Sequence, residues 1–202
     1  MYGIIKFKKT QYVFQRRNLH MNTVQPIREL SKIEEMKSVL MRQGYRDYFL
    51  FILGINTGLR ISDMLSLLVS DIKGKTHIVI REKKTGKLKH FRINNTLQYE
   101  IAQYIRGMRD EDYLFPSRKG HKTRPISRVR AYMILNGAAR EIGLDEVGTH
   151  TLRKTMGYHF YKKTKDVALL QEIFNHSAPS VTLRYIGINQ DIIDRAIDEF
   201  SL

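Results

Sequence analysis

Five kinds of side chain that can act on a phosphate group occur in a fixed order along the chain. They are Arg60, Lys84, His150 with Arg153 three residues later, His176, and Tyr185 nine residues after that. A guanidinium gives paired donors in one plane and keeps its charge, so two arginines can hold the two non-bridging oxygens of a phosphodiester. Residues three apart are neighbours on a helix, which places His150 and Arg153 on one face.

Each of these residues also has an ordinary structural explanation. Arg60 could be a solvated surface residue, and a His-x-x-Arg pair arises easily by chance in a chain with seven histidines and many arginines. Lys84 could be a solvated charge at a hairpin tip, and His176 could be a loop or capping histidine. Tyr185 could be a core aromatic residue. The order of the set, more than any single member, favours a functional interpretation.

The elements that must position these residues are mainly helical. Ser31-Lys32-Ile33-Glu34 matches a capping box, and Thr57-Gly58 breaks a second apolar helix just before Arg60, which places this arginine at a helix-helix corner. Asp166 can cap one late helix, and Pro179 can open the next. The predicted helices are 31–42, 47–56, 61–68, 96–107, 127–142, one from about Thr149, 167–174, and one from Pro179 that carries Tyr185.

One hairpin interrupts the helices. Thr76–Arg81 and Leu88–Ile93 are strand-like, with β-branched residues and partial alternation, and Lys84-Thr85-Gly86 supplies a turn between them. The chain is long enough for one proper core. The predicted fold class is therefore a single, mainly α domain with a small antiparallel sheet.

The net charge of the chain limits the classes of partner that it is expected to bind. The 202 residues contain 35 Lys and Arg against 20 Asp and Glu, a net charge of +15, and such a field attracts nucleic acid or an anionic membrane. The longest apolar run, Tyr48–Ile55, is far shorter than the ~20 residues that span a bilayer. No secretory signal is recognisable. The absence of cysteine excludes disulfides and thiolate chemistry, and agrees with a cytoplasmic location.

Basic residues outside the chemical set lie in two groups. One flanks the hairpin, and the other runs from a loop into a helix. We expect their members to contact DNA phosphates, with binding that weakens steeply as salt rises. They are Lys83, Lys87 and Lys89 in the first group and Arg124, Arg128 and Arg130 in the second.

Taken together, the residues resemble the tyrosine recombinase (phage integrase) family. Thr57–Leu68 is similar to its first-arginine box, and Lys83-Lys84-Thr85-Gly86 is similar to its hairpin lysine. His150–Gly157 resembles the H-x-x-R box, and Phe174–Ile186 resembles the last box, in which His-Ser is followed by Thr-x-x-Tyr. The resemblance covers about Pro26 to Leu202. The segment 1–25 is then a basic extension, and 26–202 is the catalytic domain.

The resemblance implies a mechanism and its partners. Tyr185 would be the nucleophile, Arg60 and Arg153 the phosphate clamps, His150 the base, Lys84 the general acid, and His176 a donor to a phosphate oxygen. A 3′-phosphotyrosyl intermediate stores the bond energy, so neither metal nor ATP is required. The implied substrates are double-stranded attachment sites, bound by several copies, expected to be a tetramer, for integration or excision of a mobile element.

Two departures from the family pattern are visible. Asn175 stands where the family usually has glycine, and asparagine tolerates the left-handed backbone better than most residues. The family's usual amino-terminal helical clamp domain is not recognisable in the short segment before residue 26.

The terminal segment is amphipathic. Ile188, Ile192, Ala196 and Phe200 form a stripe, with Ile193 and Ile197 beside it. The stripe would either pack on its own domain or dock onto a neighbouring copy.

Two other functions fit the same charge. A non-catalytic or degenerate DNA-binding regulator needs the basic surface but has no need of the ordered chemical set. A type IB topoisomerase-like enzyme would use similar chemistry without site preference, and telomere resolution is a third enzymatic alternative. Dependence of cleavage on DNA sequence distinguishes a site-specific recombinase from a topoisomerase-like enzyme.

Overall fold

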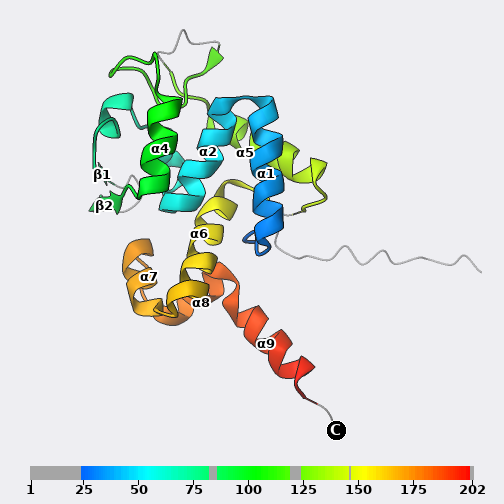
Figure 1. Ribbon diagram of the computed structural model, residues 1–202. Coiled ribbons are helices and arrows are strands. Elements are labelled where there is room, and N and C mark those ends of the chain that lie inside the picture. Colours follow the sequence, from blue (N-terminus) through cyan, green and yellow to red (C-terminus); the bar gives the residue numbers. More distant parts are fainter. Residues whose placement is uncertain (1–23, 82–85, 119–123, 146, 201–202) are drawn as a thin grey trace, which may run out of the picture.

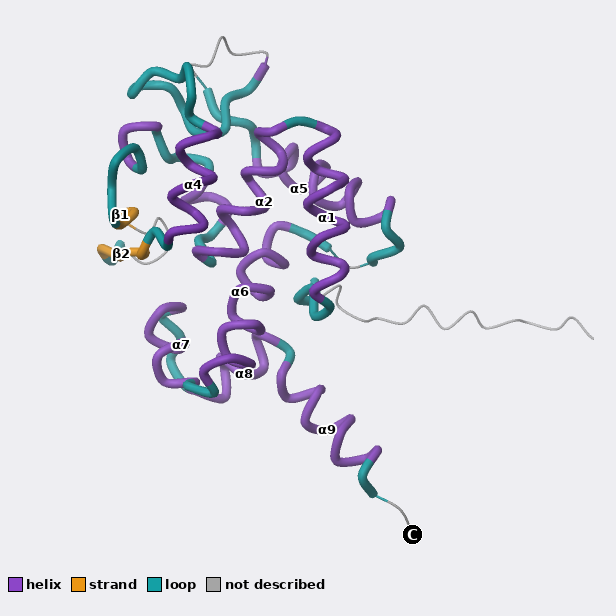
Figure 2. The backbone as a smooth tube through the Cα atoms, in the orientation of Figure 1, coloured by secondary structure: helices purple, strands orange, loops and turns teal. Residues whose placement is uncertain are grey.

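The computed structural model describes residues 24–81, 86–118, 124–145 and 147–200 (Figure 1). Lys83, Lys84 and most of the extension 1–25 lie outside the described residues. The predicted mainly helical fold with one small antiparallel sheet is confirmed (Figure 2). The elements are α1 (Leu30–Gln43), α2 (Tyr45–Thr57), α3 (Ile61–Met64), a 3-10 turn (Val69–Asp71), β1 (His77–Arg81), β2 (Leu88–Arg92), α4 (Asn95–Tyr104), α5 (Arg128–Glu141), α6 (Thr149–Thr164), α7 (Val167–Phe174), α8 (Pro179–Ile186) and α9 (Ile188–Asp198).

The larger of two hydrophobic cores is built around α2. The run from Phe49 to Gly54 is buried on every side, as expected for a helix that is apolar all round. Helices α1, α4 and α6 pack against it, and Figure 1 shows α2 between α4 and α1. The same core includes Ile78 and Phe91, because β1 and β2 pair antiparallel from His77↔Arg92 to Arg81↔Leu88 and turn these two side chains inward.

The smaller core joins α6 to α7 and α8 at one end of the molecule (Figure 1). Its buried residues are Tyr158, Leu170, Phe174, Ile186 and Ile188. Helix α6 belongs to both cores, because Leu152 near its start is buried in the larger one. None of the described helices is long and apolar enough to cross a membrane.

Gly157 lets α6, α7 and α8 approach closely. A Cβ on this residue would lie 2.7 Å from two ring carbons of Phe174 and 2.8 Å from Cγ2 of Ile186. We expect Gly157→Ala to destabilise the protein by about 1–3 kcal/mol, because the buried neighbours cannot move aside without strain. Urea unfolding measures this loss. The matched control is Gly137→Ala on the exposed face of α5, where a Cβ meets nothing within 4 Å. Equal stability of the two variants would contradict the close-packing argument.

Two local predictions are wrong. Helix α1 begins at Leu30 after Glu29, and no side chain caps it, so the capping box predicted at Ser31 does not form. Tertiary contacts instead fix the path of the chain into α1. The Ile27 amide donates to Thr155 Oγ1 at 2.9 Å, and the Ile27 carbonyl lies 2.9 Å from His159 Nε2.

The helix predicted over 61–68 ends early, at Met64. The backbone beyond it has other partners. The Leu67 carbonyl accepts from the Leu114 amide, and the Leu68 amide donates to the Asp71 carboxylate.

Helix α9 extends away from the rest of the molecule (Figure 1). Ile188 at its start is buried in the smaller core. Beyond it, the apolar residues Ile192, Ile193, Ile197 and Phe200 are 53–66% exposed. The structure therefore contradicts the alternative in which the terminal apolar stripe packs on its own domain.

Candidate active site

The structure brings five of the six predicted residues to the junction of the two cores. Arg60 precedes α3, just after Gly58 ends α2 in the left-handed conformation. His150 and Arg153 lie on α6, His176 lies in the turn between α7 and α8, and Tyr185 lies in the last turn of α8. The sixth residue, Lys84, falls outside the described residues, between β1 and β2.

The Tyr185 phenol meets His150. The hydroxyl oxygen lies 3.3 Å from His150 Nδ1, so an unprotonated Nδ1 can accept the phenolic proton. Burial raises the pKa of Tyr185 above its usual value of 10.0, while the positive charges of Arg153 and Arg60 and a hydrogen bond from Arg153 lower it. The same cations that oppose the cost of burial are the ones that stabilise a phenolate.

Arg153 connects the two cores. Only 3% of this residue is exposed. Its Nη1 donates to the Gly58 carbonyl at the end of α2, and its Nη2 donates to the Phe174 carbonyl at the end of α7, at 3.0 Å. The guanidinium carbon lies 4.1 Å from the centroid of the Phe174 ring. Arg153 thus fixes α2 and α7 relative to one another and brings a permanent charge to the phenol.

His176 is held from two sides. Its Nδ1 lies 3.1 Å from Thr182 Oγ1, and its carbonyl accepts from Gln171 Nε2 at 3.2 Å. The imidazole packs edge-on against the Tyr185 ring, with centroids 5.0 Å apart. The contact with Thr182 fixes the orientation of the imidazole beside the Tyr185 ring.

Asn175 adopts the left-handed conformation expected from its sequence, with φ 53° and ψ 48°. Its side chain also makes a contact that glycine could not make, because Lys87 Nζ donates to Asn175 Oδ1 at 2.9 Å. Lys89 Nζ, on β2 just after Lys87, donates to the Glu172 carbonyl at 2.8 Å. Lys87 and Lys89, predicted to contact DNA, thereby attach β2 to the end of α7.

We expect Asn175→Gly to change the free energy of unfolding by less than about 0.5 kcal/mol, because glycine adopts the left-handed backbone freely and the lost lysine contact is exposed. Asn175→Val should cost about 1–2 kcal/mol, because a β-branched residue is strained there. Urea denaturation of both variants measures the difference. Equal stabilities would mean that the backbone of this turn relaxes.

An open cleft faces the site. Residues of α3, α5 and α6 line it, including Arg60, Arg128, Val129, Tyr132 and His150. Arg128, predicted from sequence as a phosphate contact, therefore shares a surface with the candidate phosphate clamps. Arg124 and Arg130 are also exposed, the latter on the first turn of α5. The cleft is open to solvent.

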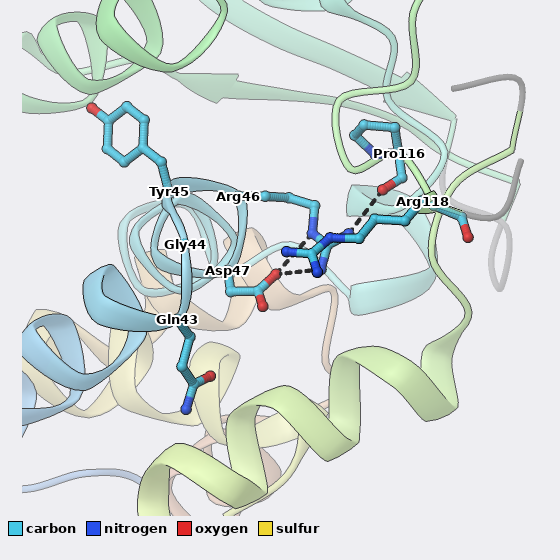
Figure 3. Close-up of a pocket in the computed structure, with 8 residues that line it drawn as sticks. Gln43, Gly44, Tyr45, Arg46, Asp47, Pro116 and Arg118 are labelled. Carbon is cyan, nitrogen blue, oxygen red and sulfur yellow. Dashed lines mark hydrogen bonds and ion pairs between the residues drawn. The ribbon is translucent and has the colours of Figure 1, made fainter. Parts of the chain in front are cut away.

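A second pocket, at the start of α2, has a structural explanation. Arg46 and Arg118 extend toward each other across it (Figure 3). Arg46 is engaged, since Nε donates to the Asp47 carboxylate at 2.8 Å and Nη1 to the Pro116 carbonyl at 3.0 Å. These bonds attach α2 to the segment that precedes α5. The pocket contains no member of the predicted set.

One residue of the site was missed from the sequence. The Lys154 ammonium lies 5.2 Å from the centroid of the Tyr185 ring. A lysine directly after Arg153 looks like an ordinary solvated helix charge, and no spacing rule relates it to a tyrosine thirty-one residues later. Among the described residues there is no cluster of three His, Cys, Asp or Glu that could hold a metal ion.

A tyrosine, a histidine and two arginines thus meet at one place on a mainly helical domain. The profile of the phage integrase family matches residues 19–191. A protein of Bacillus subtilis called probable integrase/recombinase YoeC is 53% identical over 180 residues, which are 89% of this chain and 98% of that protein. The chain therefore belongs to the phage integrase family of tyrosine recombinases.

Two longer proteins are also similar. Tyrosine recombinase XerA of Pyrococcus horikoshii is 27% identical over 177 residues, which cover 87% of this chain and 62% of that protein. The structure of XerH site-specific recombinase bound to its difH substrate superimposes with a TM-score of 0.64 at 18% identity, over 78% of this chain and 49% of XerH. The chain thus spans half to two thirds of these two relatives, and the XerH likeness concerns the fold alone.

Proposed function

We propose that this chain cleaves and rejoins DNA at specific attachment sites through a 3′-phosphotyrosyl link to Tyr185, in the integration or excision of a mobile element. The observation that carries the proposal is the Tyr185 hydroxyl placed 3.3 Å from His150 Nδ1, with the charges of Arg153 and Arg60 acting on the same phenol. A nucleophile, a proton acceptor and two guanidiniums meet beside an open basic cleft.

The proposed step is an in-line displacement at phosphorus. The Tyr185 oxygen forms a bond to phosphorus and passes its proton to His150, while the bond from phosphorus to the 5′-oxygen breaks. Arg60 and Arg153 neutralise the non-bridging oxygens, and His176 donates to one of them. Lys84 protonates the departing 5′-oxygen, a role carried over from the family. Attack by a 5′-hydroxyl reverses the step.

The reaction needs neither a metal ion nor ATP in this proposal. Guanidinium groups supply the positive charge, and the phosphotyrosine keeps the energy of the broken phosphodiester for rejoining. The substrate is double-stranded DNA, with Lys83, Lys87, Lys89, Arg124, Arg128 and Arg130 on its backbone. An enzyme acting on such DNA works in the cytoplasm of a bacterial or phage-infected cell.

The proposal is tested with a nicked duplex that contains candidate attachment sequences. A cut next to the nick releases a short 5′-hydroxyl strand that diffuses away, so the covalent complex accumulates. We expect a denaturant-resistant adduct whose phosphopeptide contains Tyr185, formed on few sequences and unaffected by a chelator. Cleavage without sequence preference would indicate a topoisomerase-like enzyme. Salt-sensitive binding without any adduct would indicate a regulator.

Assembly of several copies, expected to be a tetramer, is the second part of the proposal. The exposed apolar side chains of the terminal segment support it, because Ile192, Ile193 and Ile197 of α9 and Phe200 just beyond it are each more than half exposed. Asp191, at the start of the helix, is bound by Arg28 and by the Tyr158 hydroxyl. The base of the helix is thus held while its far end is free to dock onto a neighbour.

We expect removal of residues 192–202 to abolish multimers on DNA while single-copy binding persists, because buried apolar contacts between copies are lost. This truncation keeps the Asp191 contacts and the smaller core. Analytical ultracentrifugation with a duplex attachment site measures the assembly. Unchanged multimers in the truncated protein would show that α9 does not join the copies.

A further inference from the structure

Helix α6 surrounds the Tyr185 side chain with three basic residues. His150, Arg153 and Lys154 lie at spacings of three and four residues, so they share the face of α6 that packs against α8. His150 meets the hydroxyl end, at 3.3 Å, and the half-buried Lys154 lies over the ring, with Nζ 5.2 Å from the centroid. This distance is within the range of a cation-π contact.

Among the described residues, two further basic groups face this tyrosine from other elements. Arg60 acts on the phenol from the corner between α2 and α3, and His176 packs on the ring from the turn before α8. The carboxylates of the neighbouring helices lie in other contacts: Glu172 of α7 lines the pocket beside β2, and Asp191 of α9 is bound by Arg28 and Tyr158.

Lys154 differs from the arginines in what happens when DNA binds. Arg60 and Arg153 are placed to receive the phosphate, whose negative charge then offsets part of their field at the phenol. The Lys154 ammonium lies over the ring, so its charge acts on the ring as negative charge develops on the oxygen and spreads into the ring. An ion-ring contact of this kind strengthens when the ring becomes anionic.

We propose that Lys154 is a positioning residue that stabilises the anionic form of the Tyr185 side chain during attack on phosphorus, an inference that rests on the proposed role of Tyr185 as nucleophile. The proton of Tyr185 goes to His150, the phenolic oxygen bonds to phosphorus, and the 5′-oxygen leaves. Lys154 keeps its own proton throughout. It thereby differs from a general acid, which loses its proton to the leaving oxygen.

The test is the pH dependence of single-turnover adduct formation with two substrates. One has the natural 5′-oxygen at the scissile phosphate, and the other has a bridging sulfur, which leaves without protonation. We expect Lys154→Met to lower the rate near neutral pH about tenfold on both substrates, and to move the alkaline rise of the rate upward by about one pH unit. Lys154→Arg should restore both values, because a guanidinium also binds a ring face.

The matched control lies on the same helix. Lys162 Nζ lies 5.8 Å from the centroid of the Tyr158 ring, so Lys162→Met removes an equivalent ammonium from a tyrosine outside the site and should leave the pH profile unchanged. A deficit of Lys154→Met that disappears with the sulfur substrate would identify a proton donor and overturn the inference. A rate deficit of Lys154→Met that is equal at every pH would indicate only a packing defect and would also overturn the inference.

A second measurement does not depend on cleavage. In protein labelled with 3-fluorotyrosine, the fluorine resonance of residue 185 is the one lost in Tyr185→Phe, and its shift with pH reports ionisation of this ring. Lys154→Met should raise the midpoint by about one pH unit. An unchanged midpoint overturns the inference even where the adduct forms. A raised midpoint without any adduct in the unaltered protein means that the proposed function fails while the contact stands.

Discussion

Tyr185→Phe is expected to abolish the covalent protein-DNA adduct and to leave noncovalent DNA binding as it is in the unaltered protein. The change removes one oxygen and keeps the ring, which packs edge-on against His176 and Phe174 with centroids 5.0 and 5.7 Å away. The lost hydrogen bond to His150 is worth about 1 kcal/mol. The lost nucleophile should lower adduct formation by about 10⁴-fold or more.

Denaturing gels of the nicked-duplex reaction measure this effect, and binding to the same duplex at several salt concentrations is the control. The slope of affinity against salt should match that of the unaltered protein, because no phosphate-contacting cation has changed. A Tyr158→Phe variant provides a second control, since this tyrosine bonds to Asp191 and lies outside the site. An adduct that persists in Tyr185→Phe would show that another residue attacks the DNA.

Arg153→Lys is expected to lose both stability and activity. One guanidinium donates to the carbonyls of Gly58 and Phe174, and its carbon lies 4.1 Å from the centroid of the Phe174 ring. A lysine has a single nitrogen and no planar fork, so at least one buried carbonyl loses its partner. We expect the free energy of unfolding to fall by about 2–3 kcal/mol. Adduct formation should fall by about 10²- to 10³-fold even where the variant is folded.

The Arg60→Lys variant separates the loss of activity from the loss of stability. Arg60 is half-buried beside the open cleft and comes before a short helix, so its replacement should cost less than about 1 kcal/mol of stability. Its loss of activity should still be about 10²-fold, because one of the two proposed phosphate clamps is altered. Urea unfolding and adduct rates are measured on both variants. An Arg153→Lys variant as stable as Arg60→Lys would contradict the structural role of Arg153.

Local chemistry made much of the fold predictable from sequence. The Asp166 side chain caps α7 by accepting from the Leu169 amide, and Pro179 opens α8 at its first turn, both as expected. Gly58 and Asn175 adopt the left-handed conformations that their positions required. In each case the determining interaction lies within a few residues of its cause, so that the sequence pattern contains the information.

Interactions between distant segments were not predictable. The start of α1 depends on Ile27 bonding to Thr155, 128 residues away. The Arg153 bond to Gly58 spans 95 residues. For the candidate site, motif order identified which residues belong together but not what else each one contacts. Lys154 was missed for the same reason, because its relation to Tyr185 exists only after α6 and α8 have packed together.

The division of the molecule into a large and a small core has a consequence for hydrogen exchange. The smaller core rests on five buried residues, so α7 and α8 should open at a lower free energy than α2 and should exchange their amides first. Each such opening carries Tyr185 and His176 away from Arg60 and separates Phe174 from Arg153. On gentle heating, the capacity to form an adduct should therefore disappear while most of the helical circular dichroism signal remains.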